Sequence, residues 1–211
     1  MFKRLTFSVV LALLAAPQLR AQGGGTIESG AMRLTAISGG LAHGSALVVD
    51  PAGTSDTRLS PGPTFGLELQ FPGFLVGSLY VGASASFSSL QHGANLGVVA
   101  GPGASSASVL LGTAGLVFAA NDWFNNMQPT FRVGAGFKSY MFEANGASSS
   151  MSLTGDFGVG FRAGTGPIGI AAEIRFLPSA FDQAKLPLRG LSPQDQQQND
   201  LLFTVGVTVR P

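Results

Sequence analysis

The chain has 211 residues, of which 12 are Lys or Arg, 11 are Asp or Glu and none is Cys. The absence of Cys excludes disulfides, thiolate metal sites and thiol catalysis, and a near-neutral charge without a basic stripe excludes a nucleic-acid partner. Only 11% of the residues are charged and the mean hydropathy is positive, so the folded protein must accommodate an unusually apolar surface.

The first 21 residues have the three-part pattern of a secretory signal peptide. Lys3 and Arg4 precede an apolar run over 5–16, and a short polar stretch ends at Ala21, where we expect cleavage. The apolar run is too short to cross a bilayer as a helix, which takes about 20 residues. Cleavage would remove basic residues and no acid, so we expect the mature domain, 22–211, to be mildly acidic.

The rest of the chain has the pattern of β-strands. No later segment is long and apolar enough for a spanning helix, and only helices and closed barrels satisfy their backbone groups within lipid. From Thr26 onward, apolar residues alternate with small or polar ones between turn-rich segments. This period of two predicts strands. We predict eight of them, at 26–37, 62–71, 75–90, 107–120, 127–142, 150–163, 167–177 and 200–210.

The segment 150–163 shows the alternation most clearly. Its odd positions hold mainly Met, Leu, Phe and Val, whereas its even positions hold Ser, Thr, Gly, Asp156 and Arg162. Successive side chains of a strand point to opposite faces, so one face is apolar and the other polar. The register of the first strand stays open, because Glu28 and Arg33 have opposite parity.

The links between the predicted strands alternate in length. Short links follow the second, fourth and sixth strands, and links that are longer on the whole follow the first, third, fifth and seventh. This alternation is typical of an up-and-down membrane barrel with both termini in the periplasm, short periplasmic turns and longer external loops. The expected short links are 72–74, 121–126 and 164–166, and the expected external loops are 38–61, 91–106, 143–149 and 178–199.

A soluble exported barrel with an apolar interior, such as a lipocalin-type binder, is the alternative. The composition of the polar face separates the two, because it consists largely of small residues such as Ser84, Gly134 and Gly158. A solvated surface favours long charged side chains, whereas the interior of an eight-stranded barrel has little room. The sequence therefore favours small residues inside and an apolar band facing lipid.

The predicted architecture resembles the small outer-membrane barrel family of the OmpA transmembrane domain, OmpX and OmpW. The resemblance covers the mature chain and is architectural, without a short shared motif. It implies an all-β, eight-stranded antiparallel up-and-down transmembrane barrel, placed in the outer membrane after Sec-type export, with outer-membrane lipid and the barrel-assembly machinery as partners. Many such barrels end in an aromatic residue, whereas this chain ends Thr208-Val209-Arg210-Pro211.

Aromatic residues concentrate near the ends of the predicted strands, where membrane proteins have interfacial girdles. We predict a girdle on the periplasmic side formed by Phe71, Phe74, Trp123, Phe124, Phe131 and Phe161. We predict a second girdle near the outer loops, formed by Phe65, Phe87, Tyr140, Phe142 and Phe176.

Charged residues on the inward parity are nearly balanced in sign. They predict an ion-pair network that plugs the lumen, formed by Glu68, Arg132, Lys138, Asp156, Arg162, Glu173 and Arg175. The hairpin links suggest that Asp156 lies at the height of both Lys138 and Arg175, within cross-strand or diagonal reach.

The sequence supplies little for catalysis. His43 and Ser45 resemble the His-x-Ser pattern of outer-membrane lipid A deacylases, but they fall in an expected loop with Asp50 as the only adjacent acid, and a nucleophile also needs an oriented base. Gly-x-Gly stretches such as 134–136 lie within strands, which excludes a dinucleotide fingerprint. We predict no catalytic residues, no cofactor and no metal site.

These observations leave three functions open. A structural or interaction protein of the outer membrane is favoured, with loops 38–61 and 178–199 available for an extracellular ligand. A narrow transporter for small or apolar solutes and a lipid-modifying enzyme are the alternatives.

Overall fold

The computed structural model describes residues 32–44, 61–77, 79–93, 106–120, 127–142, 149–164, 166–181 and 196–210. Side chains are described for these residues except 90–93, 106, 107, 142, 181 and 196. Within this part of the chain, no helix is long and apolar enough to cross a membrane.

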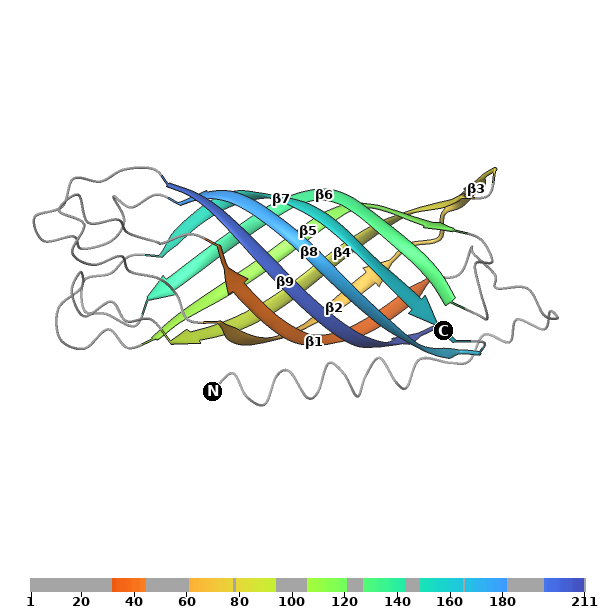
Figure 1. Ribbon diagram of the computed structural model, residues 1–211, viewed down its shortest axis with the longest axis horizontal. Helices are drawn as coiled ribbons and strands as arrows, with labels where there is room; N and C mark the ends of the chain where they lie inside the picture. Colours follow the sequence, from red (N-terminus) through yellow and green to blue (C-terminus); the bar gives the residue numbers. More distant parts are fainter. Residues whose placement is uncertain are drawn as a thin grey trace, which may run out of the picture.

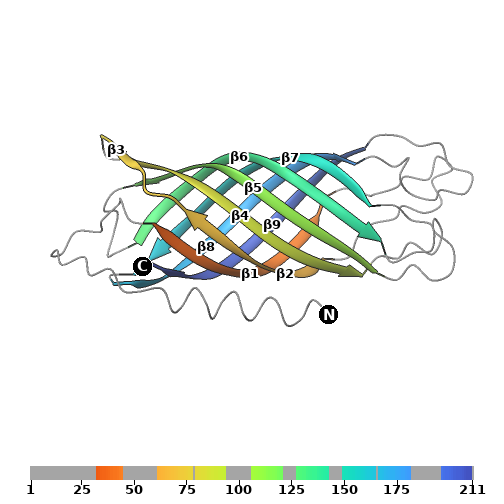
Figure 2. The same cartoon turned by 180° about the vertical axis from the view of Figure 1, so that it is seen from behind.

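The strands form one antiparallel sheet that closes into a barrel (Figure 1). Its hydrogen-bonded order is β2-β1-β9-β8-β7-β6-β5-β4-β3, and the β2–β4 pairing closes the ring. The view from behind shows β1, β2 and β4 completing the wall (Figure 2). The strand bounds are β1 Arg33–His43, β2 Gly62–Gln70, β3 Phe74–Val76, β4 Leu79–Gly93, β5 Ser106–Ala120, β6 Met127–Phe142, β7 Ser150–Ala163, β8 Ile168–Phe181 and β9 Gln196–Val209.

Strand β3 continues β2 past a bulge, so nine segments make eight barrel strands. Against β4, the pairing passes from Gln70↔Ser84 to Phe74↔Val81, which inserts one extra residue into the β2–β3 strand. Gly73 fits this bulge because a Cβ there would lie 2.0 Å from the Val81 carbonyl oxygen. The predicted link at 72–74 is therefore wrong. The chain turns at Gly77, whose positive φ of 61° suits a tight hairpin.

The strands also reach further than predicted at the opposite end. β1 continues to His43, and β8 and β9 remain paired out to Phe181↔Gln196. The interpretation of 178–181 and 196–199 as loop is wrong, because these residues pair with one another in the β8–β9 ladder, and Gln198 is buried on the inward parity. The interpretation of 38–43, 91–93 and 106 as loop is wrong too, because β1, β4 and β5 extend over them. A polar residue at a strand end has no hydrophobic pattern to mark it, since the barrel interior is itself polar there. Residues 26–31 of the first predicted strand lie outside the described residues.

The predicted faces are confirmed by the burial pattern. Even positions of β2, β4, β6, β7 and β9 and odd positions of β1, β5 and β8 face the lumen. The opposite parity presents large apolar side chains outward, with Leu153 at 84% and Val205 at 62% exposed. An apolar exterior around a polar interior is the reverse of a soluble barrel. The arrangement excludes the lipocalin-type alternative.

Inward glycines let neighbouring strands approach. A Cβ on Gly136 would lie 2.0 Å from the Gly112 carbonyl oxygen, and one on Gly134 would lie 2.5 Å from that of Ala114. The Gly-x-Gly stretch of β6 thus serves close packing against β5.

Candidate functional site

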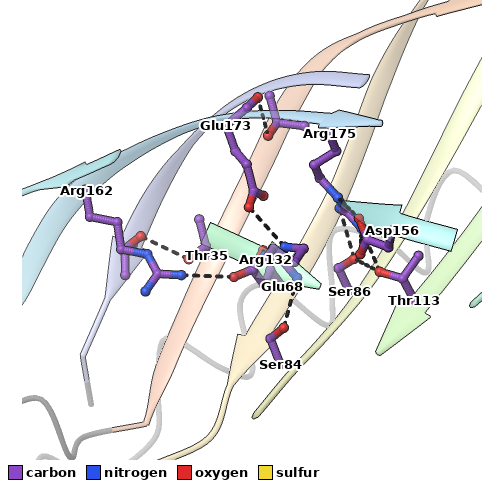
Figure 3. A network of polar contacts seen from close by, with 12 residues as sticks. Thr35, Glu68, Ser84, Ser86, Thr113, Arg132, Asp156, Arg162, Glu173 and Arg175 are labelled. Atoms are coloured by element: carbon purple, nitrogen blue, oxygen red, sulfur yellow. Dashed lines mark hydrogen bonds and ion pairs between the residues drawn. The ribbon is translucent and has the colours of Figure 1, made fainter. Parts of the chain in front are cut away.

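Arg132 on β6 spans the middle of the lumen. Its guanidinium bonds the Glu68 carboxylate on β2, Glu173 Oε1 on β8 at 3.0 Å and Ser84 Oγ on β4 at 2.9 Å (Figure 3). Arg162 on β7 donates to the other Glu68 oxygen at 3.3 Å. Arg132 on β6 therefore links its own strand to β2, β4 and β8. Its hydrogen bonds to the carboxylates of Glu68 and Glu173 are charge-assisted.

Arg175 on β8 forms a second crossing level. Its Nε and Nη2 contact the two Asp156 oxygens at 2.9 and 2.6 Å, a bidentate pair with the adjacent strand β7. The same guanidinium reaches Ser86 Oγ at 3.2 Å and Thr113 Oγ1 at 2.6 Å on the far wall. Arg132 and Arg175 have 1% and 0% of their surfaces exposed, so both charges are withdrawn from bulk water.

Lys138 belongs to a third level, nearer the long links. Its Nζ donates to Asp200 Oδ2 at 2.8 Å, Ser179 Oγ at 3.0 Å and the Leu177 carbonyl at 2.7 Å. The other Asp200 oxygen lies 3.0 Å from His43 Nδ1. The expectation that Asp156 lies within reach of Arg175 is confirmed by their ion pair. Its expected proximity to Lys138 is wrong, because Lys138 is paired with Ser152 in the β6–β7 ladder and bonds Asp200.

All seven side chains of the predicted network therefore point inward, but they form separate levels. The first joins Glu68, Arg132, Arg162 and Glu173, the second joins Asp156 with Arg175, and Lys138 stands apart. The sequence reasoning missed Asp200 and His43. The parity of the last strand, extended back from Thr204, would have placed Asp200 inward.

Buried aliphatic side chains surround the Lys138–Asp200 contacts at the long-link end of the lumen. We expected mainly small residues throughout the lumen, so the larger side chains at this end differ from the prediction. The buried residues there include Leu41, Val109, Leu111, Leu177 and Leu202.

Most described members of the predicted aromatic girdles point outward. Tyr140 is the exception, because it is fully buried on the inward parity of β6, so its assignment to the outer girdle is wrong. Trp123, Phe124 and the side chain of Phe142 lie outside the described residues. The outward-facing members are Phe65, Phe71, Phe74, Phe87, Phe131, Phe161 and Phe176.

The structure changes the surroundings expected for His43. The residue lies in β1 rather than in a loop, and its acidic neighbour is Asp200 on β9. Ser45 and Asp50 lie outside the described residues. Among the described residues, no cluster of His, Asp and Glu has the composition of a metal site.

No protein-family model matches the chain, and no curated protein matches its sequence. Solved structures match its fold. Neisserial surface protein A superposes with a TM-score of 0.52 at 12% identity, over 85% of this chain and 97% of that one. OprG from Pseudomonas aeruginosa gives 0.46 at 12% identity, over 86% and 97%, and Ail of Yersinia pestis gives 0.45 at 14%, over 85% and 98%. The predicted architecture is confirmed, and the chain has the fold of the small eight-stranded outer-membrane barrels.

Proposed function

We propose that the protein is an integral outer-membrane barrel with a structural or interaction role, whose lumen is closed by its own side chains. The observation that carries this proposal is the pair of arginines that cross the lumen, Arg132 and Arg175, with almost none of their surfaces exposed. We also propose that residues 1–21 direct export and that the barrel-assembly machinery inserts the mature chain.

The outer wall supports a location in lipid. Large apolar side chains on β2, β3, β7 and β8 expose more than half of their surface, namely Phe65, Phe74, Leu153 and Ile168. Such an exposed apolar wall costs free energy in water at roughly 25 cal/mol per Å². Lipid removes that cost, and the pairing of β2 with β4 closes the described strands into a ring, as backbone groups in lipid require.

Two cavities that the described residues line inside the lumen are small, which argues against transport. One cavity of about 20 Å³ lies among Thr35, Glu68 and Thr204, and another of about 10 Å³ lies beside Arg33. A cavity needs roughly 10–15 Å³ to hold one water molecule. These spaces suit isolated waters rather than a solute path, so transport would require the crossing side chains to move.

An interaction role would use the long links. The links 44–61, 94–105, 143–149 and 182–195 join strands at one end of the barrel, whereas 121–126 and 164–167 join them at the other. Surface loops on a rigid scaffold commonly carry recognition. We propose that these links face outward and offer the contact sites predicted for 38–61 and 178–199, except where those ranges are strand.

Catalysis at His43 is the less favoured alternative. Its ring contacts Asp200, as a catalytic base would contact an orienting acid. Both side chains are almost completely buried, at 1% and 0% exposure, and Asp200 also holds Lys138. These contacts support a role in closing the barrel.

Cell fractionation combined with planar-bilayer recording tests the proposal. We expect the protein in the outer-membrane fraction, with a gel mobility that changes on boiling because the closed barrel unfolds only when heated. Purified protein should give no steady conductance. Recovery only in the soluble periplasm would contradict the location, and large, stable single-channel steps would contradict the closed lumen.

A further inference from the structure

Cations accumulate at the short-turn end of the lumen. Arg33 on β1, Arg162 on β7 and Arg210 after β9 line one cavity with Gln128 and Thr208. Arg33 and Arg210 are the next residues beyond the ladder pair Leu34↔Val209, which places them opposite each other on neighbouring strands. Like charges in this arrangement destabilise a sheet. The charges of Arg162 and Arg210 both act unfavourably on that of Arg33.

The nearby acid does not balance this charge. Among the described residues, Glu68 is the one carboxylate bonded to any of the three arginines, through Arg162 at 3.3 Å, and it also serves Arg132. Arg33 instead crosses the mouth to a neutral partner, with Nη1 3.3 Å from Gln128 Oε1. Positive charge is therefore in excess among the residues that the structure describes at this end.

Three buried hydrogen-bond donors around the cavity have no acceptor among the described residues. They are Arg33 Nη2, Arg162 Nη1 and Gln128 Nε2, from three different strands. Arg33 and Gln128 are each only 3% exposed. Buried donors are almost always paired in native proteins, because an unpaired one loses its bond to water without replacement.

An anion would neutralise the excess positive charge and accept hydrogen bonds from the unpaired donors. We infer that Arg33, Gln128, Arg162 and Arg210 form a binding site for a compact anion at the short-turn mouth of the barrel. The cavity has a volume of about 10 Å³, comparable with the roughly 10–15 Å³ that one water molecule needs. A halide ion, or a single oxygen of a phosphate that enters from the mouth, matches this size. Guanidinium groups present planar donor pairs that suit such oxygens.

The inference goes beyond the proposed function, since neither a membrane scaffold nor a closed lumen requires a bound anion. Chlorine-35 NMR line broadening by the refolded barrel in detergent gives a direct test. We expect wild-type protein to broaden the chloride signal saturably, and inorganic phosphate to reverse the broadening by competition. Persistence of the broadening in phosphate would restrict the site to halides. Reversal by a short-chain phosphatidic acid at much lower concentration than by inorganic phosphate would identify a lipid headgroup as the source.

Matched variants locate the site. Arg33→Gln should lose most of the broadening, whereas Lys138→Gln, which removes a cation from the far end of the lumen, should keep it. The heat-dependent gel shift shows whether each variant folds, and Arg210→Gln at the rim replaces Arg33→Gln if the latter does not. Equal broadening in wild type and in the folded arginine variant would overturn the inference. So would wild-type protein that broadens no chloride signal and binds no phosphate in equilibrium dialysis.

Discussion

Asp156 and Arg175 form a bidentate ion pair across the β7–β8 ladder, with nitrogen–oxygen distances of 2.9 and 2.6 Å. Asp156 stands where the ladder is interrupted, between the pairings Thr154↔Ser179 and Phe157↔Phe176, whereas Arg175 is paired with Gly158 just beyond the interruption. Pro178 has no N–H to donate to the ladder there. The carbonyl oxygen of Pro178 accepts a hydrogen bond from the Thr154 hydroxyl, with an oxygen–oxygen distance of 3.0 Å. Side-chain bonds therefore supplement backbone bonds at this height of the wall.

Removing one partner of this pair should destabilise the barrel strongly. Asp156→Ala leaves the Arg175 guanidinium buried without its counter-charge, and we expect a loss of about 3–5 kcal/mol in the free energy of unfolding. The temperature at which gel mobility changes should fall accordingly. Asp156→Leu combined with Arg175→Met should recover much of the loss, because Ser86 and Thr113 bond each other at 2.9 Å without the arginine. An unchanged transition in the single variant would remove Asp156 from the structural network.

His43 should contribute to stability and not to catalysis. We expect His43→Ala to lower the unfolding temperature, because Asp200 loses the partner at 3.0 Å while keeping Lys138. The cost should be smaller than that of Lys138→Ala, which leaves the carboxylate without its nearest full positive charge. Lipid A profiles from cells that express wild type and His43→Ala should be identical. An acyl chain lost only in cells with the wild-type protein would revive the enzyme hypothesis.

The alternation of residues predicted which side chains enter the lumen but not which of them meet. Strand parity is local, so Arg132, Asp156 and Arg175 were placed inward from the sequence alone. Contacts across the barrel depend on strand tilt and on pairings between distant segments. Lys138 on β6 contacts Asp200 on β9, and this contact could not be predicted from the register of one hairpin.

Strand ends were predicted less well for a related reason. A lumen lined by polar residues gives a strand the same composition as a loop once its outward residues also become polar. Residues 178–181 and 196–199 have the composition of a loop, yet they pair in the sheet. The bulge before β3 was missed because Pro72 and Gly73 have the composition of a turn, and Gly77, where the chain actually turns, lies only four positions after Gly73.

Surface proteolysis tests the orientation of the barrel. We expect trypsin added to whole cells to cleave after Lys185 or Arg189 in the link 182–195, because the long links should face outward. Chymotrypsin should reach Trp123 and Phe124 in the short link 121–126 only after the outer membrane is permeabilised. Cleavage at 121–126 in intact cells, with 182–195 spared, would reverse the proposed topology.

Closure of the barrel should depend on Gly39 and not on its neighbour Gly40. Gly39 faces the lumen where β1 meets β9, and a Cβ there would lie 1.7 Å from the Phe203 carbonyl oxygen. A backbone atom cannot move aside as a flexible side chain can, so Gly39→Ala must separate the first and last strands locally. A Cβ on Gly40 would lie 3.7 Å from the Gly62 carbonyl oxygen, which is an ordinary contact.

The two substitutions add the same methyl group at adjacent positions, so they have similar effects on the unfolded chain. After refolding in detergent, Gly40→Ala should reach the wild-type fraction of fast-migrating folded protein, and Gly39→Ala should give a smaller fraction and a lower unfolding temperature. Equal behaviour of the two variants would show that the β1–β9 seam tolerates separation at this level.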